Sequence, residues 1–197
     1  MAQDTVQIPT AIDLFSGCGG LSAGLRNAGF EIVAAVENEP LACATYKLNH
    51  PDTLLLERDI TGLRPKYLRK RIGLEEGELT LLAGCPPCQG FSTLRTLNGG
   101  KNVNESMNDL VFQFMKFIKA FLPKAIMMEN VPGLAKDPRI NDFQKEIGTL
   151  GYLSETRVLD AADFSTPQRR KRMVLIAIRG NVPAFAEMRT AVRKWST

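Results

Sequence analysis

The segment Asp13-Leu14-Phe15-Ser16-Gly17-Cys18-Gly19-Gly20 decides the fold of this chain. It joins a short apolar run, residues 11–15, to a candidate helix at residues 21–28. Glycines directly after a buried strand let the backbone approach a ligand closely, and the start of the next helix offers free N–H groups. The match to the pattern G-x-G-x-x-G is incomplete, because Ser22 stands at the third glycine. By itself, therefore, this turn is a weak signal of a nucleotide-type cofactor site.

Short apolar runs and amphipathic stretches alternate along the rest of the chain. The runs are too short for helices and too continuous for half-exposed strands, which is typical of buried strands in a parallel sheet. The expected strands are residues 11–15, 32–36, 53–56, 79–83, 125–128, 152–159 and 173–178. The expected helices are residues 21–28, 41–48, 110–121 (capped by Asp109) and 140–150. This alternation predicts an α/β fold with a doubly wound, mostly parallel sheet.

The composition is that of an ordinary globular domain and selects no function. Of 197 residues, 44% are hydrophobic and 23% are charged, and the net charge of +4 permits an anionic partner without requiring one. We see no secretion signal and no apolar run long enough to span a bilayer, so we expect a cytoplasmic protein without a membrane partner.

The four cysteines are expected to be reduced. The single histidine, His50, is expected to be a solvated residue ending a helix, and no metal site is expected.

Two acidic residues follow strands near the glycine-rich turn. Glu37 closes the second expected strand about 20 residues beyond the glycines, where an acidic residue can bind ribose hydroxyls. Asp59 closes the third strand in the same way. Each has a structural alternative, Glu37 as a helix-start carboxylate and Asp59 as a turn residue. Taken together, the three strand ends bring polar groups to one edge of the sheet and favour a cofactor site there.

The fourth expected strand leads into the segment Gly84-Cys85-Pro86-Pro87-Cys88-Gln89-Gly90-Phe91-Ser92. Two cysteines separated by two residues could be half of a zinc site, but Cys18 and Cys43 do not form a suitable second pair. They could also be a redox dithiol. A third interpretation is a nucleophilic thiol at the carboxyl end of a strand, activated by its surroundings.

Four motifs, each beside an expected strand, resemble those of the C5-cytosine-specific DNA methyltransferase family, and they occur in the family's order. They are Asp13-Leu14-Phe15-Ser16-Gly17-Cys18-Gly19-Gly20-Leu21, then Pro87-Cys88-Gln89-Gly90-Phe91-Ser92, Glu129-Asn130-Val131 and Gln168-Arg169-Arg170-Lys171-Arg172. The resemblance covers roughly residues 12–178. It implies a Rossmann-like fold that uses S-adenosylmethionine, and DNA methylation of the restriction-modification kind.

The resemblance assigns the catalytic residues. Cys88, not Cys85, is the implied nucleophile, which adds to C6 of the cytosine so that C5 can take up a methyl group. The implied role of Glu129 is to donate a proton to N3, which burial of the carboxyl would favour. Arg172 is expected to contact the cytosine O2. Arg170 is expected near the thiol and the DNA phosphates, where its charge could lower the pKa of the thiol.

The resemblance also assigns the cofactor pocket. Phe15 would pack on the adenine, Glu37 would hold the ribose and Asp59 would contact the adenine amino group. Leu110, early in the helix after the thiol segment, matches a further pocket position. The remaining implied cofactor residues are Ser16, Gly17, Gly19, Gly20, Leu21, Ile60 and Pro86. As structural alternatives, Phe15 could belong to the core and Glu129 could cap a turn.

The expected partner is double-stranded DNA, from which the target cytosine is flipped at a cost of about a few kcal/mol. Residues 93–108, rich in Asn, Gly and Ser, are expected to form a mobile catalytic loop that closes on DNA, although composition alone equally allows a simple connection. The basic run at residues 64–71 matches no motif and is interpreted as a helix surface.

Residues 1–197 are expected to be one catalytic domain, incomplete by the family's standard. The family continues with a target-recognition region and a final segment that completes the cofactor pocket, and neither is seen in this sequence. The chain is therefore either a partial product or one subunit of a split enzyme whose partner chain supplies the missing half. On either interpretation, we expect little or no activity from the chain alone and weak DNA affinity.

Three other functions are consistent with parts of the sequence. A tRNA cytosine-5 methyltransferase of the same fold tends to carry Pro-Phe-Thr after the glutamine of the nucleophile motif, whereas this chain has Gly90-Phe91-Ser92. A non-catalytic subunit is argued against by the intact Cys88, Glu129 and Arg172. A nicotinamide-dependent oxidoreductase would leave the Cys88 and Arg172 motifs unexplained.

Overall fold

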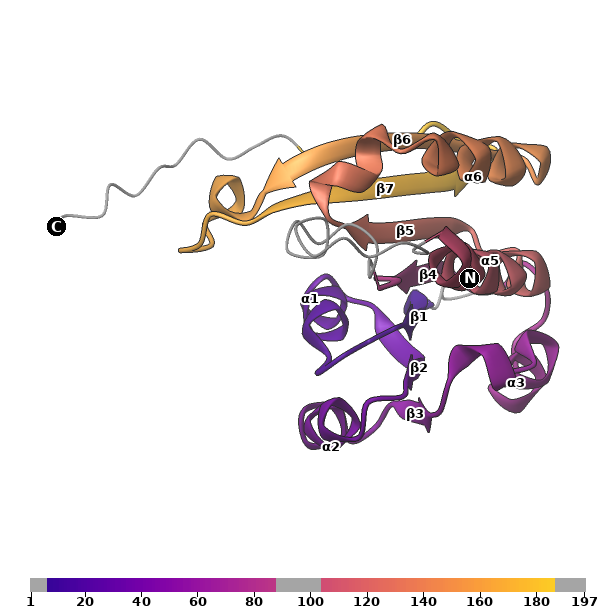
Figure 1. Ribbon diagram of the computed structural model, residues 1–197. Coiled ribbons are helices and arrows are strands. Elements are labelled where there is room, and N and C mark those ends of the chain that lie inside the picture. Colours follow the sequence, from indigo (N-terminus) through magenta and orange to yellow (C-terminus); the bar gives the residue numbers. More distant parts are fainter. Residues whose placement is uncertain (1–6, 88–103, 187–197) are drawn as a thin grey trace, which may run out of the picture. The chain divides into compact units, whose positions relative to one another are not determined.

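The computed structural model describes residues 7–87 and 104–186. Its seven strands are β1 (Thr10–Leu14), β2 (Glu31–Glu37), β3 (Leu54–Glu57), β4 (Leu81–Gly84), β5 (Ala125–Asn130), β6 (Tyr152–Asp160) and β7 (Lys171–Arg179). The α-helices are α1 (Gly20–Asn27), α2 (Pro40–Asn49), α3 (Pro65–Arg71), α5 (Asn104–Phe121) and α6 (Pro138–Thr149) (Figure 1). Short 3₁₀ helices are η1 (Ile60–Gly62), η2 (Pro132–Lys136) and η3 (Ala161–Phe164).

The strands form one mostly parallel sheet in the order β3-β2-β1-β4-β5-β7-β6. The crossover order, in which β1 lies between β2 and β4, is that of a doubly wound α/β fold. All seven strands lie where the apolar runs predicted them, so the expected fold class is confirmed. The chain divides into two compact units, unit 1 with Met1–Pro86 and Asn108–Ile126 and unit 2 with Pro87–Met107 and Met127–Thr197.

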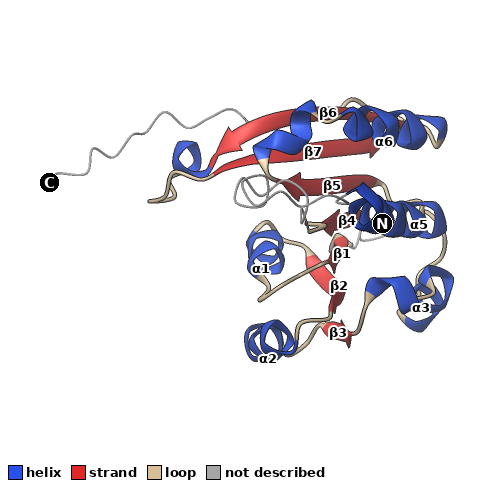
Figure 2. Cartoon of the chain, in the orientation of Figure 1, coloured by secondary structure: helices blue, strands red, loops and turns tan. Residues whose placement is uncertain are grey.

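Unit 1 contains the first four strands, and every pairing among them is parallel. β1 pairs with β2 and with β4, and β2 pairs with β3. Helices α1 and α2 cover one face of these strands, and α3 and α5 cover the other (Figure 2). Because β1, β2 and β4 each have strands on both sides and helices over both faces, most of their side chains are apolar and buried, whereas β3 lies at the edge of the sheet. The largest fully buried side chains include Tyr46, Phe114, Phe117, Phe121, Ile12 and Leu14.

Unit 2 is built on the antiparallel pair β6 and β7, which runs in register from Tyr152↔Arg179 to Asp160↔Lys171. Helix α6 packs on β6. Ile140, Phe143 and Ile147 of α6 are buried, and they recur at the spacing of one helix face. Asp137 caps this helix, because its Oδ1 accepts a hydrogen bond from the backbone N–H of Arg139 at 2.9 Å.

The start of α5 corrects two sequence expectations. The helix begins at Asn104, so Asp109 lies inside it and does not cap it. Residues 104–108 of the expected loop are therefore helical, and residues 93–103 lie outside the described residues. The Asn, Ser and Asp residues in this stretch favour caps and turns locally. The amphipathic pattern that buries Phe114, Phe117 and Phe121 nevertheless continues as helix through them.

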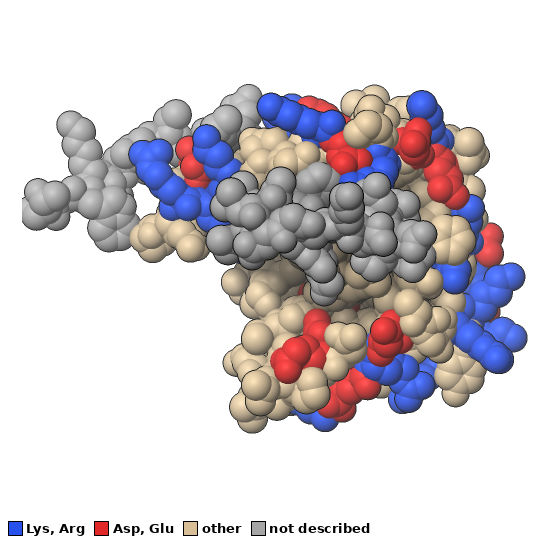
Figure 3. Space-filling view, viewed as in Figure 1, with Lys and Arg blue, Asp and Glu red and all other residues tan. Residues whose placement is uncertain are grey.

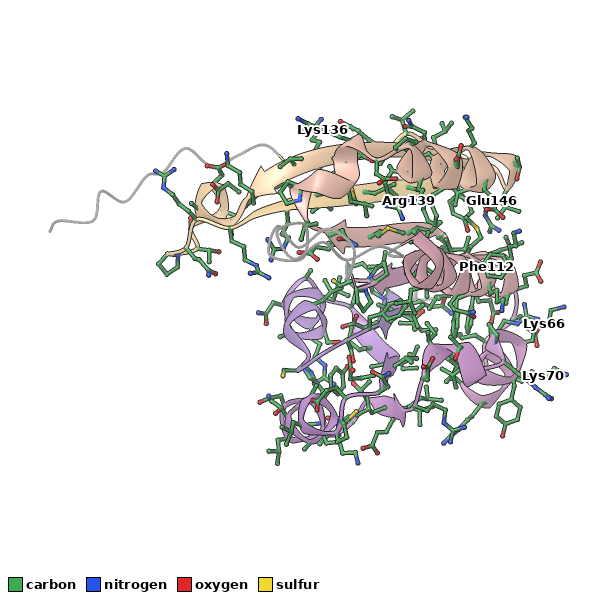
Figure 4. All side chains as sticks on the ribbon, in the orientation of Figure 1. Lys66, Lys70, Phe112, Lys136, Arg139 and Glu146 are labelled. Carbon is green, nitrogen blue, oxygen red and sulfur yellow. The ribbon has the colours of Figure 1, made fainter. Side chains whose placement is uncertain are left out.

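The basic run at residues 64–71 forms helix α3, as expected. Arg69, Lys70 and Arg71 occupy its last turn, where cations interact favourably with the helix dipole. Lysine and arginine side chains gather over this helix, and Lys66 and Lys70 extend away from the strands (Figures 3 and 4). Only Leu68 of the helix is buried.

His50 corrects a further expectation. It ends α2, as predicted, but only 4% of its surface is exposed, and its ring lies 4.5 Å from that of Tyr46. The ring is buried because Gly19, which has no side chain, leaves room for it. Among the residues that the structure describes, no helix is both long and apolar enough to cross a bilayer.

Candidate functional site

The glycine turn, residues 15–20, is held in a conformation that most side chains avoid. Phe15, Gly17 and Gly19 have positive φ values of 60°, 55° and 91°. The N–H of Ser16 continues the pairing with β2 by donating to the Val36 carbonyl at 3.1 Å, and the N–H of Gly19 donates to the Ser16 carbonyl at 2.9 Å. Phe15 is only partly buried, so its strained backbone is not explained by membership of the core. Strain of this kind persists mainly where a ligand or a mechanism requires it.

Glu37, at the end of β2, organises the backbone around this turn. One carboxylate oxygen accepts the N–H of Gly17 at 2.8 Å. The other accepts the N–H groups of Asn38 and Glu39, each at 2.8 Å. A carboxylate has about four acceptor sites. Three are filled by these backbone donors, which fix the carboxylate in place and leave about one site for a hydroxyl group.

Asp59 and Ile60 follow β3. Asp59 caps η1, since its Oδ1 accepts both the N–H and the hydroxyl of Thr61 at 2.7 Å. The hydrogen bonds from the Thr61 hydroxyl and N–H lower the pKa of this carboxyl below its ordinary value. Asp59 is exposed and Ile60 is buried. The turn role that the sequence predicted for Asp59 is therefore present, and its hydrogen bonds to Thr61 use only Oδ1 of this exposed side chain.

Ser22 explains why the third glycine of the dinucleotide pattern is missing. Its hydroxyl is fully buried and lies 2.6 Å from Oδ2 of Asp13, to which it donates. It also lies 2.8 Å from the Tyr46 hydroxyl. A glycine here would allow close helix–strand packing. The serine instead links β1, α1 and α2 through one buried polar network, which the sequence did not predict.

Within this network, the pKa of the Asp13 carboxyl is shifted the most from its ordinary value. Burial raises its pKa from 3.8 to about 7, helped by the charge of Glu37 and opposed by the hydrogen bonds from Ser22. Its Oδ1 has no hydrogen-bond partner among the described residues. The folded chain therefore holds this proton up to a much higher pH than the unfolded chain does.

We expect replacement of Asp13 by asparagine to flatten the pH dependence of stability. Because the folded pKa is raised, the stabilising contribution is fully present below about pH 4 and is lost as the pH rises through 7. Between pH 5 and pH 8 the free energy of unfolding of the wild type should fall by roughly 2–3 kcal/mol relative to the variant. Urea unfolding of both proteins at the two pH values measures this. The prediction would be contradicted if the free energies of unfolding of the wild type and the variant differed by the same amount at pH 5 and at pH 8.

The other expected cofactor residues of unit 1 lie at the same edge. The four strands are parallel, so their carboxyl ends meet there. Leu21 is in the first turn of α1, Pro86 is buried after β4, and Leu110 is a partly buried residue of α5. The Ser16 hydroxyl is also buried, and among the described residues it has no hydrogen-bond partner. A buried hydroxyl without a partner is rare in a protein alone and points to an additional polar ligand.

In unit 2, the structure brings together two of the expected catalytic side chains. Nε of Arg172, at the start of β7, lies 2.7 Å from a carboxylate oxygen of Glu129, near the end of β5. The two side chains are 25% and 26% exposed. From the sequence we expected Glu129 to be buried, which would favour its protonated form. In the structure its carboxyl is partly exposed and forms an ion pair with the Arg172 guanidinium. Arg172 also donates through Nη1 to the Lys171 carbonyl at 2.7 Å, which limits the directions its guanidinium can take.

Asp160 positions the basic motif, a role that the sequence did not predict. Its Oδ1 accepts the backbone N–H of Arg170 at 2.9 Å and that of Ala162 at 3.2 Å. The hydrogen bonds from these two N–H groups lower the pKa of the Asp160 carboxyl. Arg170 itself is exposed. Cys88, the expected nucleophile, lies outside the described residues, which contain no cluster of three or more His, Cys, Asp or Glu suited to a metal ion.

These features define a class of protein: a doubly wound α/β protein with a strained glycine turn at the carboxyl end of its first strand. The particular family follows from comparison with known proteins. The model of the C-5 cytosine-specific DNA methylase family matches residues 10–194, and the chain belongs to this family. The resemblance carried by the four motifs is thereby confirmed.

Curated relatives are type II methyltransferases. The chain is 38% identical over 167 residues to M.AgeI of Thalassovita gelatinovora, covering 83% of this chain and 38% of the relative. It is 35% identical over 181 residues to M.XorII of Xanthomonas oryzae, covering 89% and 42%. The chain thus spans about two fifths of the length of these relatives. A shorter relative, M.AquIA of Picosynechococcus, is 35% identical over 179 residues, covering 85% of this chain and 71% of the relative.

Solved structures share the fold. The Spodoptera frugiperda DNMT2 mutant superimposes with a TM-score of 0.66 at 26% identity, covering 92% of this chain and 53% of that one. The S. pombe Dnmt2 methyltransferase superimposes with a TM-score of 0.70 at 23% identity, covering 90% and 51%, which shows the fold alone.

Proposed function

We propose that the chain is the catalytic part of a DNA (cytosine-5-)-methyltransferase that uses S-adenosylmethionine and Cys88 as its nucleophile. The observation that carries the proposal is the ion pair of Glu129 and Arg172 at 2.7 Å, formed by residues 43 positions apart at the ends of two strands. Together these two side chains offer one carboxyl and one guanidinium. That set matches a flipped cytosine, whose ring edge carries the acceptors O2 and N3 and the N4 amino donor.

The reaction needs these groups because cytosine C5 is a poor nucleophile. The Cys88 thiolate adds to C6, forming a C–S bond and pushing the ring electron pair toward C5 and N3. Glu129 donates a proton at N3, and Arg172 donates hydrogen bonds to O2, where negative charge develops. C5 then takes up the methyl group. Loss of the C5 proton finally expels the thiolate, and return of the N3 proton to Glu129 restores the neutral aromatic ring.

The residues at the strand ends of unit 1 fit S-adenosylmethionine. When bound, this cofactor supplies an electrophilic methyl group on its sulfonium. Glu37 has about one acceptor site left for a ribose hydroxyl, and Asp59 has an exposed carboxylate oxygen for the adenine amino group. The partnerless hydroxyl of Ser16 lies next along the sheet edge, in the strained turn after β1, the strand on the other side of β2 from β3. Phe15, partly exposed, offers a ring for stacking on the adenine.

The proposed substrate is double-stranded DNA, in a restriction-modification context consistent with the names of the relatives. The matched segment is about two fifths of M.AgeI and M.XorII, so further sequence must complete the activity of such enzymes. We propose that a complementary segment, corresponding to the rest of these relatives, supplies target recognition. A second chain is one possible source, and the 71% coverage of M.AquIA shows that a much shorter methyltransferase exists in the family.

Trapping of the covalent intermediate tests the function. The purified chain is incubated with S-adenosylmethionine and duplex DNA containing 5-fluorocytosine, alone and with the complementary segment of a relative such as M.AgeI. Fluorine at C5 blocks the last elimination, so the protein stays attached to the DNA on a denaturing gel. We expect an adduct when the complementary segment is present, at most a trace with the chain alone, and none for Cys88→Ser.

Two controls separate this function from its alternatives. Cys85→Ser, which removes the neighbouring thiol, should leave the adduct intact. A tRNA containing 5-fluorocytosine should give less adduct than duplex DNA, and the reverse result would favour a tRNA methyltransferase. Binding of S-adenosylmethionine without adduct in any mixture would favour a non-catalytic subunit. Absence of both cofactor binding and adduct would refute the proposal.

A further inference from the structure

The buried histidine at the end of α2 has no part in the proposed reaction, yet it contacts the glycine turn directly. Nε2 of His50 lies 3.0 Å from the carbonyl oxygen of Gly19. A carbonyl can only accept, so Nε2 carries the hydrogen and His50 is the donor. Its other nitrogen, Nδ1, is buried without a partner among the described residues. Among the described residues, the one hydrogen bond that this ring makes is therefore to the glycine turn.

The imidazole of His50 fits in this place only because residue 19 is a glycine. A Cβ atom added to Gly19 would lie 2.4 Å from Nε2 and 2.5 Å from Cδ2 of His50, and 3.0 Å from Cδ2 of Tyr46. The two distances to His50 are clashes and the one to Tyr46 is a tight contact. Both rings are buried and lie tilted against each other, with centroids 4.5 Å apart and planes at 39°. Tyr46 and His50 are four residues apart and so share one face of α2. This face carries both contacts to the start of α1.

The hydrogen bond controls the direction of one peptide unit. In a planar trans peptide, the C=O of Gly19 and the N–H of Gly20 point in opposite directions. His50 and the N–H of Ala23, which donates at 2.9 Å, hold the carbonyl on the buried side. The Gly20 N–H is therefore directed away from the core. That side is open, since Gly20 is exposed and an added Cβ would meet no atom within 4 Å.

We propose that His50 is a positioning residue for the methyl-donor site, holding the Gly19–Gly20 peptide so that the Gly20 N–H is presented to an acceptor group of the cofactor. The inference rests on the proposed function, because it assumes that the cofactor binds at the glycine turn. Tyr46 supports it from the other side, through the 2.8 Å contact of its hydroxyl with Ser22 in the first turn of α1. The N-terminal N–H groups of a helix favour acceptors with negative charge.

A matched pair of substitutions tests this role. In His50→Gln, the side-chain amide nitrogen can occupy the place of Nε2 and donate to Gly19, whereas in His50→Asn the amide is one bond too short. We expect His50→Asn to weaken binding of S-adenosylmethionine by about tenfold, because one hydrogen bond is lost and the peptide it held is freed. His50→Gln should stay within about threefold of the wild type. Titration calorimetry of the full chain measures both, and circular dichroism confirms that each variant is folded.

A second measurement needs no variant, in case His50→Asn does not fold. In ¹⁵N–¹H spectra of the wild type, addition of S-adenosylmethionine should shift the Gly20 amide resonance strongly and leave that of Gly24, in the middle of α1, nearly unchanged. Equal cofactor affinity of His50→Asn and the wild type, or an unmoved Gly20 resonance on saturation, would overturn the inference. A wild type that binds no cofactor, either alone or with the complementary segment, would instead refute the proposed function.

Discussion

Replacing Glu129 by glutamine is expected to lower the rate of methyl transfer at least about a hundredfold, with little change in stability. Glutamine keeps the shape of the side chain but cannot give a proton to N3, and general acid catalysis contributes about 10²–10⁴ to such a step. The ion pair with Arg172 is partly exposed, so its loss should cost at most about 1 kcal/mol of folding free energy. Single-turnover transfer of labelled methyl groups to duplex DNA measures the rate.

The comparison uses the preparation in which the wild type is active, alone or with the complementary segment. The matched control is Glu155→Gln, which also removes a carboxylate from an ion pair in unit 2, the one with Arg157 at 2.6 Å. Glu155→Gln should leave the rate of methyl transfer within about twofold of the wild type. Glu155 lies on β6 opposite Ile176, four residues along β7 from Arg172. If Glu129→Gln retained more than a tenth of the wild-type rate, Glu129 would not be the proton donor.

Replacing Gly19 by alanine should destabilise the fold by about 2–5 kcal/mol and abolish cofactor binding. Part of the cost is the φ of 91°, which a residue with a Cβ adopts at an expense of about 1–2 kcal/mol. The rest is the overlap of that Cβ with the buried ring of His50, and overpacking of this kind costs about 1–3 kcal/mol. Relief of the clash would push the ring away and rotate the peptide that it holds. Urea unfolding and calorimetric titration with S-adenosylmethionine measure the two effects.

Gly24→Ala is the control for this substitution. Gly24 lies inside α1, its added Cβ would meet nothing within 4 Å, and its φ is not positive. Alanine should stabilise the helix there by about 0.5–1 kcal/mol. Similar stability of the two variants would show that the contact between Gly19 and His50 does not restrict the turn.

Local sequence patterns predicted the strands and most of the helices. Burial on both faces of a parallel sheet demands continuous apolar runs, and such runs are visible in the sequence without any knowledge of contacts. The boundaries differ by a few residues, as β4 beginning at Leu81 shows. The larger error came at α5, where Asp109 looked like a cap. The helix starts at Asn104 because its buried aromatic face outweighs the weak helix propensity of its first residues.

The candidate site was predicted as a set of residues but not as a set of contacts. Glu129, Arg170 and Arg172 were identified from motifs, whereas the ion pair of Glu129 with Arg172 and the two hydrogen bonds of Asp160 became visible only in the structure. Glu37 was expected to hold a ribose, and the structure shows that it first holds three backbone N–H groups. The roles of the cofactor residues and of Cys88 stay predictions.

The sequence by itself determined the alternation of strands and helices, the family and the order of its motifs, because periodicity and short motifs are local properties of a chain. The tertiary structure decided where His50, Ser22 and Asp13 lie. His50, at the end of a helix and before a proline, was expected to be solvated, and Ser22 in place of a glycine looked like a small departure from the motif. Only the approach of α2 to the turn after β1 buries these side chains together, because their burial depends on partners 9 to 31 residues away in sequence.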